Sequence, residues 1–470
     1  MTPPSSLTVA GSLSLRAPER PAAARPTTPT VGPRLSASWL AAQGRLPLAF
    51  MALGLAWLVL ATAMLALAPA ALALPHSAPH VVAITHAWVL GFFVTIATGA
   101  SYQIAPVALG TTLQSERYGW WHFGLHAVAV PGMVYAFWRW DMVLLGHFGA
   151  VFAIGIILFA VNTWQTVRRS GQRDVVAWSL AFAASWLLIT VLAGLLLSLN
   201  RYWNFLPLNP VALLRAHAHL GLVGFFITLL QGVSFRLVPM FTLADVPDWR
   251  SVRVGLWLSQ LGLLGLAPAL AWQNGYAAAI FGAAILGGLI ATGRALQRAL
   301  ATRKKRFVDP GISAFLRGGA TLVLSAVLGL LLVWPTTPWG SAPGGFNAMV
   351  YAIAVFAGGL LPAVSGMLCK IVPFLTWMRA YGPKVGRVPT PAAGALTNPV
   401  LENWGLNLQA VAVLPLAAGA WLLSPAWLAV GAGLLGCGVI LFTADMLTVL
   451  RHLWKPIVLT APPAPNRTRP

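Results

Sequence analysis

Three histidines in long apolar stretches have the spacing of metal ligands. His86 lies near the start of one stretch, and His217 and His219 lie two residues apart near the start of another. Two imidazoles on facing helices can hold a heme from both sides, and we predict that His86 and His219 form such a pair. Two helical steps turn a side chain by about 200°, so His217 points to a different side of its helix and can serve a second site.

The stretch that begins at His86 recurs at His219. The residues HAWVLGFFVT match HLGLVGFFIT at an offset of 133 positions (219 − 86 = 133), and glycine, serine and proline recur further along both stretches. A fainter third copy lies 134 residues after the second, where Gly358 takes the place of Gly224 and no histidine is present. Three copies, four helices apart, predict a parallel bundle with threefold pseudo-symmetry.

The composition is that of a membrane protein. Of 470 residues, 58% are hydrophobic and 8% are charged, and the mean hydropathy of +0.77 excludes a soluble enzyme. We predict an all-α, polytopic protein with about twelve transmembrane helices in residues 47–455, after a disordered tail of residues 1–46 and before a short tail of residues 456–470. The predicted spans are 47–74, 80–108, 119–138, 142–167, 175–199, 211–241, 252–272, 274–296, 313–334, 346–378, 404–423 and 426–450.

The net charge of +21 is explained by where the basic residues lie along the chain, because they mark one face of the membrane. Alternating loops place 27 of the 30 Lys and Arg residues on one face and leave Arg139, Arg201 and Arg215 on the other (30 − 3 = 27). The positive-inside rule then predicts that both termini are cytoplasmic, in a bacterial-type inner membrane. The basic residues need no nucleic-acid partner to explain them, and the predicted partner is the lipid bilayer.

The histidine-bearing stretches carry a family resemblance. His217-Ala-His219-Leu-Gly221-Leu-Val-Gly224, with Gly232 and Val238-Pro239 further on, resembles the HxHxGxxG…G…VP helix of heme-copper oxidase catalytic subunits, closest to the cbb type. The stretch from His86 to Phe93, with Ala105-Pro106-Val107-Ala108-Leu109-Gly110 after it, resembles that family's second helix.

This resemblance implies a b-type heme ligated by His86 and His219, with His217 bound to a second heme or another ligand. It also implies electron transfer or redox chemistry on oxygen, nitric oxide or a quinol, a cytochrome or quinol as electron donor, and further membrane subunits. The HxH pattern lies in the tenth helix of the family but in the sixth stretch here, and the sequence has no adjacent His-His pair of the kind that the family's copper site uses. Copper, and activity as an oxidase or a nitric oxide reductase, therefore stay open. The chain is also similar in size and histidine-bearing helices to the NnrS group of heme and copper membrane proteins.

Other side chains are candidates for supporting roles. Arg201 and Arg215 could pair with heme propionates, because a guanidinium meets a carboxylate with two hydrogen bonds. His147 could be a third ligand or a hydrogen-bond partner on the same face. His122 and His126 are four residues apart, a spacing that can chelate a metal, but they fall toward the cytoplasmic side.

A different class of function also fits the buried histidines. A membrane transporter, or a factor that handles and assembles heme or copper, uses repeats, Gly- and Pro-interrupted helices and buried histidines to build a translocation site or a proton relay. Transporter repeats are usually inverted or twofold, whereas the repeat here is parallel and threefold.

Overall fold

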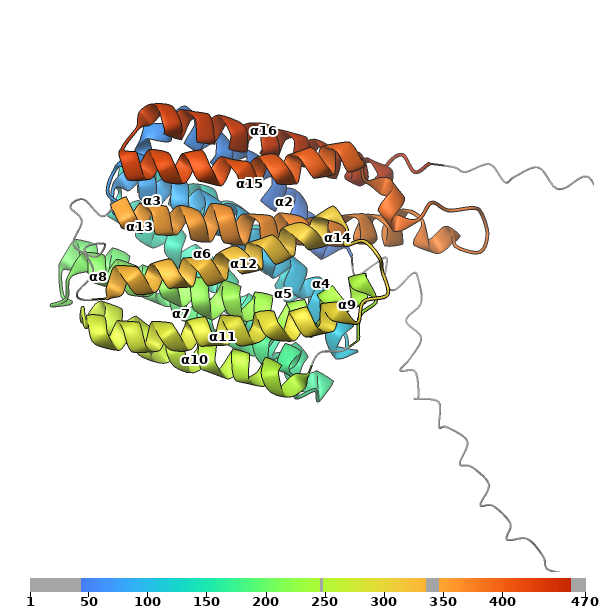
Figure 1. Ribbon diagram of the computed structural model, residues 1–470, viewed down its shortest axis with the longest axis horizontal. Helices are drawn as coiled ribbons and strands as arrows, with labels where there is room; N and C mark the ends of the chain where they lie inside the picture. The colour runs from blue at the N-terminus through green and yellow to red at the C-terminus, as the bar shows by residue number, and fades with distance from the viewer. Residues whose placement is uncertain (1–43, 246–247, 335–345, 458–470) are drawn as a thin grey trace, which may run out of the picture. The chain divides into compact units, whose positions relative to one another are not determined.

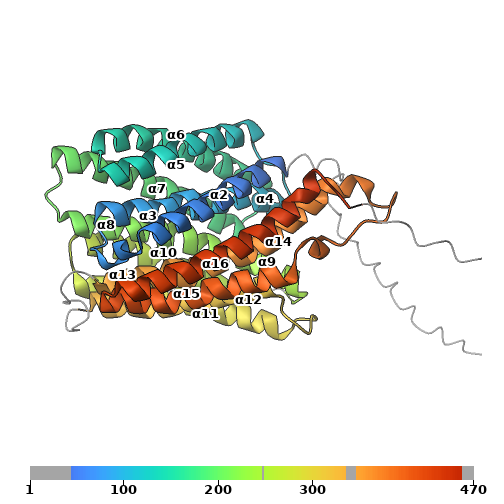
Figure 2. The ribbon, with the colours of Figure 1, turned by 90° about the horizontal axis from the view of Figure 1, so that it is seen from above.

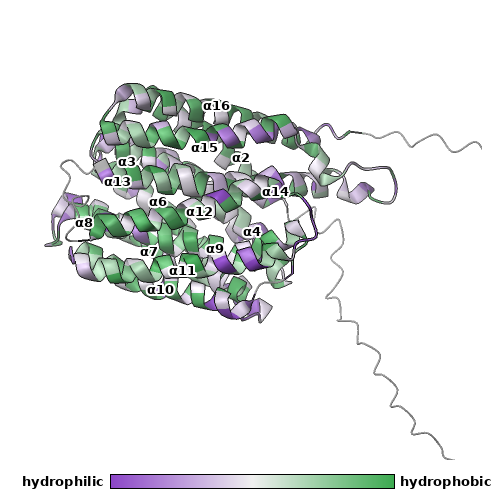
Figure 3. Cartoon of the chain, viewed as in Figure 1, coloured by the Kyte–Doolittle hydropathy of each residue, from purple (hydrophilic) through white to green (hydrophobic). Residues whose placement is uncertain are grey.

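Long helices make up the fold. The computed structural model describes residues 44–245, 248–334 and 346–457, and the elements within these ranges are helical. The long helices run side by side in both views (Figure 1, Figure 2), and hydrophobic residues cover most of their length (Figure 3). Eleven of the helices in these ranges are long and apolar enough to cross a membrane. The chain is therefore a multi-pass, all-helical membrane protein.

The order of elements repeats itself three times along the chain. Each unit has one straight helix, one long helix interrupted by a π-helical segment, and a pair of helices. The first unit contains α2 (Arg45–Leu67), α3 (Pro79–His86), η2 (Ala87–Val94), α4 (Thr95–Leu109), α5 (Glu116–Arg139) and α6 (Met142–Ser170). The second contains α7 (Val175–Trp203), α8 (Pro210–His219), η3 (Leu220–Ile227), α9 (Thr228–Thr242), α10 (Trp249–Ala271) and α11 (Gly275–Ala301). The third contains α12 (Pro310–Val333), α13 (Phe346–Ile353), η5 (Ala354–Leu360), α14 (Leu361–Ala380), α15 (Pro399–Leu422) and α16 (Pro425–Leu450).

Contacts between helices repeat in the same way. The straight helix of each unit packs on the π-helical segment and on the helix after it: α2 on η2 and α4, α7 on η3 and α9, and α12 on η5 and α14. The last helix of each unit contacts the first helix of the next, in the pairs α6–α7, α11–α12 and α16–α2. The three units therefore follow one another around a closed ring, and α3, α8 and α13 lie at the same end of the bundle (Figure 1, Figure 2).

One predicted span lacks the apolar content of the others. The third stretch, predicted over residues 119–138, forms the helix α5 but is not among the eleven apolar helices. Charged residues at both of its ends, Glu116, Arg117 and Arg139, and two histidines within it lower its hydropathy. Length and composition thus give eleven spans in the described part of the chain, and a twelfth crossing by α5 stays a prediction. The predicted tails, 1–46 and 456–470, lie almost wholly outside the described residues.

Glycine in the π-helical segments lets a neighbouring aromatic ring approach closely. A Cβ atom on Gly91 would stand 2.5 Å from Cδ2 of Trp57, and one on Gly224 would stand 2.6 Å from Cβ of Trp186. The threonine that follows each of the first two segments, Thr95 or Thr228, donates its hydroxyl to the carbonyl five residues earlier, at 2.9 Å and 3.0 Å. These contacts fix the depth and rotation of the helices that carry the histidines.

Several of the scarce polar residues begin helices. A side-chain oxygen at the N-cap accepts a hydrogen bond from a backbone N–H of the first turn, which would otherwise lack a partner. Residues with this role are Ser115, Asp141, Asp174, Asn209, Asp248, Asn274, Asp309 and Asn398. Four of the nine acidic residues are thus used to start helices.

We expect Gly366→Ala to destabilise the third unit. A Cβ atom there would collide with the carbonyl oxygen of Gly311 and lie 2.9 Å from the amide nitrogen of Phe315, so α12 and α14 must separate. Overpacking of this kind lowers the free energy of unfolding by about 1–3 kcal/mol, which thermal unfolding in detergent would detect as a lower midpoint. Gly433→Ala in α16 is the matched control, because nothing lies within 4 Å of its Cβ position. Equal midpoints for the two variants would contradict this account of the α12–α14 contact.

Candidate functional site

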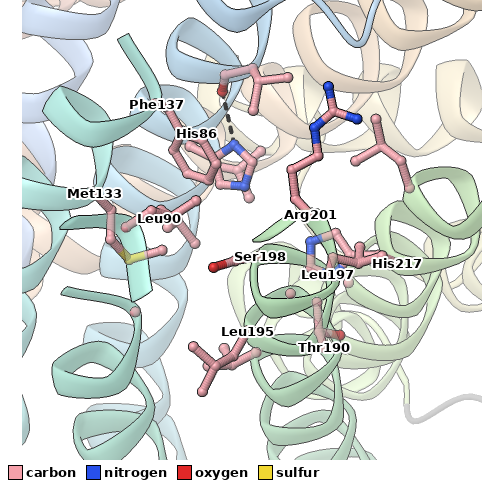
Figure 4. A pocket seen from close by; sticks show the side chains of 18 of the residues that line it. His86, Leu90, Met133, Phe137, Thr190, Leu195, Leu197, Ser198, Arg201 and His217 are labelled. Atoms are coloured by element: carbon pink, nitrogen blue, oxygen red, sulfur yellow. Dashed lines mark hydrogen bonds between the residues drawn. The ribbon is translucent and has the colours of Figure 1, made fainter. Parts of the chain in front are cut away.

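A large cavity lies between the first and second units. Its volume is about 480 Å³, and we call it the main cavity. His86 of α3 and His217 of α8 lie on different walls of it (Figure 4). Most of its other lining is apolar. The lining residues drawn in Figure 4 include Leu90, Met133, Phe137, Thr190, Leu195, Leu197, Ser198 and Arg201.

A smaller cavity adjoins the main cavity near α13. Its volume is about 280 Å³, and we call it the side cavity. His86 and His217 line it as well as the main cavity, so these two rings stand at the boundary between the two spaces. The other polar residues that line the side cavity include His76, Arg215, His219, Asn347 and Tyr351.

A backbone carbonyl orients the His86 ring. Nδ1 lies 2.8 Å from the carbonyl oxygen of Val82, and because a carbonyl only accepts, Nδ1 carries the proton. Nε2 then holds the free lone pair, which is the arrangement that a metal-ligating histidine adopts. The ring also stacks on Phe137, with 4.2 Å between centroids and 30° between planes, so its rotation is restricted.

A glycine on the neighbouring helix makes room for the His217 ring. A Cβ atom on Gly194 of α7 would stand 2.9 Å from Cε1 of His217. Nδ1 of His217 is buried and has no hydrogen-bond partner. A buried polar atom without a partner lowers the stability of the folded protein by about 1–3 kcal/mol. A bound group that interacts with this nitrogen would offset that loss.

Both nitrogens of His219 have partners within the protein. Nδ1 donates to the carbonyl of Arg215 at 2.8 Å, and Nε2 lies 3.2 Å from the hydroxyl of Tyr351. His219 lines the side cavity but not the main cavity. The structure therefore brings His86 and His217 to the main cavity, whereas His86 and His219, the pair that the sequence predicts, share only the side cavity.

The two arginines lie at different cavities. Arg201, near the end of α7, lines the main cavity, and Arg215 of α8 lines the side cavity. Both side chains are largely exposed, so each stands at the rim of its own cavity.

The remaining histidines lie away from both cavities. His147 is exposed on α6, where its Nδ1 donates to the carbonyl of Val143 at 2.7 Å, and it lines neither cavity. His122 and His126 are buried between α5 and its neighbours, behind the wall of the main cavity. No group of three or more His, Cys, Asp or Glu residues in the described ranges is arranged to hold a metal ion.

Tyr351 is a site residue that the sequence reasoning missed. It contacts His219 from α13, 132 residues away. The repeat carries the signal that could have found it, because Tyr351 lies at the third-unit position of His217 (217 + 134 = 351). The third copy has no histidine at this position, and the phenol of Tyr351 is the polar group that stands there.

Comparison with known proteins finds a likeness of fold. No family model matches the chain, and no curated protein matches its sequence. Its structure is similar to that of a heme-copper terminal oxidase solved as a dimer by cryo-electron microscopy, with a TM-score of 0.61 and 11% sequence identity, over 87% of this chain and 83% of that chain. The chain therefore has a heme-copper oxidase-like fold, and the predicted all-helical membrane architecture is confirmed at that level.

We expect Arg215→Gln to raise the pKa of His76, which lies in the loop before α3. Burial, and second the positive charge of Arg215, hold the pKa of His76 below its ordinary value of 6.5. Histidine NMR signals followed against pH would measure the change, and the pKa should stay below its ordinary value because burial remains. Since the pKa is lowered in the folded protein, His76 contributes stability above pH 6.5 that is lost as the pH falls below it. An unchanged pKa in the variant would show that the two residues do not interact.

Proposed function

We propose that this protein binds a b-type heme in the main cavity and uses it for electron transfer or redox chemistry. The observation that carries the proposal is the pair His86 and His217: both line one apolar cavity of about 480 Å³, Nδ1 of His86 is bonded to Val82 so that Nε2 keeps its lone pair, and Nδ1 of His217 is buried without a hydrogen-bond partner. The oxidase-like fold supports it, and so does the recurrence of the histidine-bearing helix.

The cavity fits such a group in volume, polarity and donor set. About 480 Å³ lies within the range of roughly 300–1,000 Å³ that ligand sites occupy, and apolar walls with a few polar groups are typical of them. An iron porphyrin bound between two imidazoles supplies one-electron redox chemistry. His86 and His217 would hold the iron, and Arg201 would pair with a propionate. Neither Cys369 nor Cys437 lines the cavity, which favours a b-type heme held without thioether bonds.

His219 has a different role in this proposal. The resemblance to oxidases implies that His219 pairs with His86, but His219 would first have to release the hydroxyl of Tyr351. We therefore assign His217 as the partner of His86 in the main cavity. His219 and Tyr351 belong to the side cavity. A second heme, or a small substrate such as oxygen or nitric oxide, would bind there, whereas copper has no defined site in either cavity.

The wider setting belongs to the same proposal. It includes a threefold pseudo-symmetric bundle of twelve transmembrane helices in a bacterial inner membrane, with both termini cytoplasmic. A cytochrome or a quinol would donate electrons, and further membrane subunits could take part. The closed ring of three similar units supports the symmetry.

A reduced-minus-oxidised visible spectrum of the detergent-purified protein tests the heme site. We expect a b-type α-band in the wild type, confirmed as its pyridine haemochrome, and loss of most of this band in His86→Ala and in His217→Ala. His219→Ala should keep the band, because His219 does not line the main cavity. His147→Ala is the control for general effects of removing a histidine.

Two results would overturn this assignment. If His219→Ala loses the band and His217→Ala keeps it, the heme lies between His86 and His219, as the oxidase resemblance implies. If the wild type holds no heme after expression with excess heme and reconstitution, the redox function fails, and a transporter or a metal-handling factor becomes the better explanation.

A further inference from the structure

His122 and His126 form a second histidine site, separate from both cavities. Both side chains are fully buried on α5, and their ring centroids lie 5.6 Å apart. The ring of Phe152 lies 5.2 Å from that of His126 and also lines the main cavity. The pair thus stands one side chain behind the wall of the main cavity.

Each of the two imidazoles is fixed through one nitrogen and leaves the other without a partner. Nδ1 of His122 lies 3.0 Å from the hydroxyl of Tyr102, and Nε2 of His126 lies 2.7 Å from the hydroxyl of Thr95. Nε2 of His122 and Nδ1 of His126 are buried and have no hydrogen-bond partner. Metal-ligating histidines are commonly held in this way, with one nitrogen hydrogen-bonded and the other on the metal.

The hydrogen bonds of Thr95 determine the tautomer of His126. Thr95 has one hydroxyl proton, and it donates this proton to the carbonyl of Leu90 at 2.9 Å. Toward His126 the hydroxyl must therefore accept, so Nε2 of His126 carries the ring proton. Nδ1 consequently presents a lone pair, buried among side chains that offer it no hydrogen.

The other two units also connect the interrupted helix to the helix that follows it, and they do so without histidine; in the third unit the connection lies about one turn further along, at Ser365. Gln260 of α10 donates to Thr228 at 2.8 Å, and Ser365 of α14 donates to Gln409 of α15 at 3.1 Å. A glutamine is thus sufficient to tie the interrupted helix of a unit to the helix that follows it. The need to connect the two helices therefore does not explain why residue 126 is a histidine. It also does not explain the second histidine, His122, one turn earlier.

The surroundings of the pair restrict which ion it could hold. Two imidazole nitrogens that share an ion are at most about 4 Å apart, since each metal–nitrogen bond is about 2 Å, and rings with centroids 5.6 Å apart can meet this requirement. The aromatic rings that contact the pair, all within the described ranges, are those of Phe50, Tyr102, Phe152 and Phe159.

No Asp, Glu, Cys or further His of the described ranges joins the pair in a group that could hold a metal ion, so a divalent ion would bring two uncompensated charges into an apolar site. Zn²⁺ also requires about four ligands. A soft monovalent ion brings a single charge and accepts fewer ligands, and imidazole is a suitable donor for copper. We propose that His122 Nε2 and His126 Nδ1 bind one Cu⁺ ion between α4, α5 and α6.

Cu⁺ titration of the purified full chain tests this site. Competition with bathocuproine disulfonate under anaerobic conditions, followed by metal analysis, would count the copper retained per chain. We expect the wild type to retain one more Cu⁺ per chain than His126→Gln. This variant removes the ligand but keeps an amide that can bond Thr95, as Gln260 bonds Thr228. X-ray absorption of the additional ion should show low coordination by nitrogen.

Further variants separate the metal site from a structural role. Tyr102→Phe should weaken Cu⁺ binding about 10- to 100-fold, since it removes the hydroxyl that orients His122 and keeps the aromatic ring. His147→Gln should bind as the wild type does. Retention equal to the wild type in both His122→Gln and His126→Gln would overturn the proposal, and so would Zn²⁺ bound as tightly as Cu⁺. Heme content does not enter this measurement, so its outcome is independent of the function proposed above.

Discussion

Backbone groups within a bilayer must find their partners inside the protein, and the three interrupted helices depend on this constraint. Each helix widens into a π-helical segment instead of breaking, and a threonine hydroxyl gives the carbonyls of Leu90 and Val223 an additional partner. The wider turn places Gly91 and Gly224 against tryptophan rings of the straight helices. Because His86 and His219 directly precede these segments, the same geometry sets where the candidate ligands stand.

Local patterns in the sequence predicted much of this architecture. Long apolar stretches indicate membrane helices, and the match between the stretches at His86 and His219 indicates a repeated unit, which the order of elements reproduces. The predicted span at α5 is not among the eleven apolar helices, because its two histidines, which are buried and do not face lipid, lower its hydropathy. Burial of His122 and His126 depends on neighbouring helices, and no window within α5 contains that information.

Pairings between distant residues could not be predicted. Spacing alone correctly indicated that His217 and His219 point to different sides, but not which of them shares the main cavity with His86. That depends on Tyr351, which approaches from 132 residues away and bonds His219, and on Gly194, which leaves space for the His217 ring. The repeat marks Tyr351 as the third-unit counterpart of His217, but nothing in the sequence shows that it bonds His219 or that Gly194 faces His217.

Hydrogen bonds, more than position, distinguish the roles of these histidines. His219 uses both nitrogens within the protein, and this holds its ring in place but leaves no lone pair for a metal until Tyr351 moves. His86 and His126 each use one nitrogen, and in both cases the partner is an acceptor, so the second nitrogen is the one with the lone pair. In an apolar interior a free lone pair is costly unless something binds it. Nδ1 of His217 beside the main cavity and Nδ1 of His126 behind it are both buried without a hydrogen-bond partner, so packing alone leaves this cost uncompensated at two adjacent places.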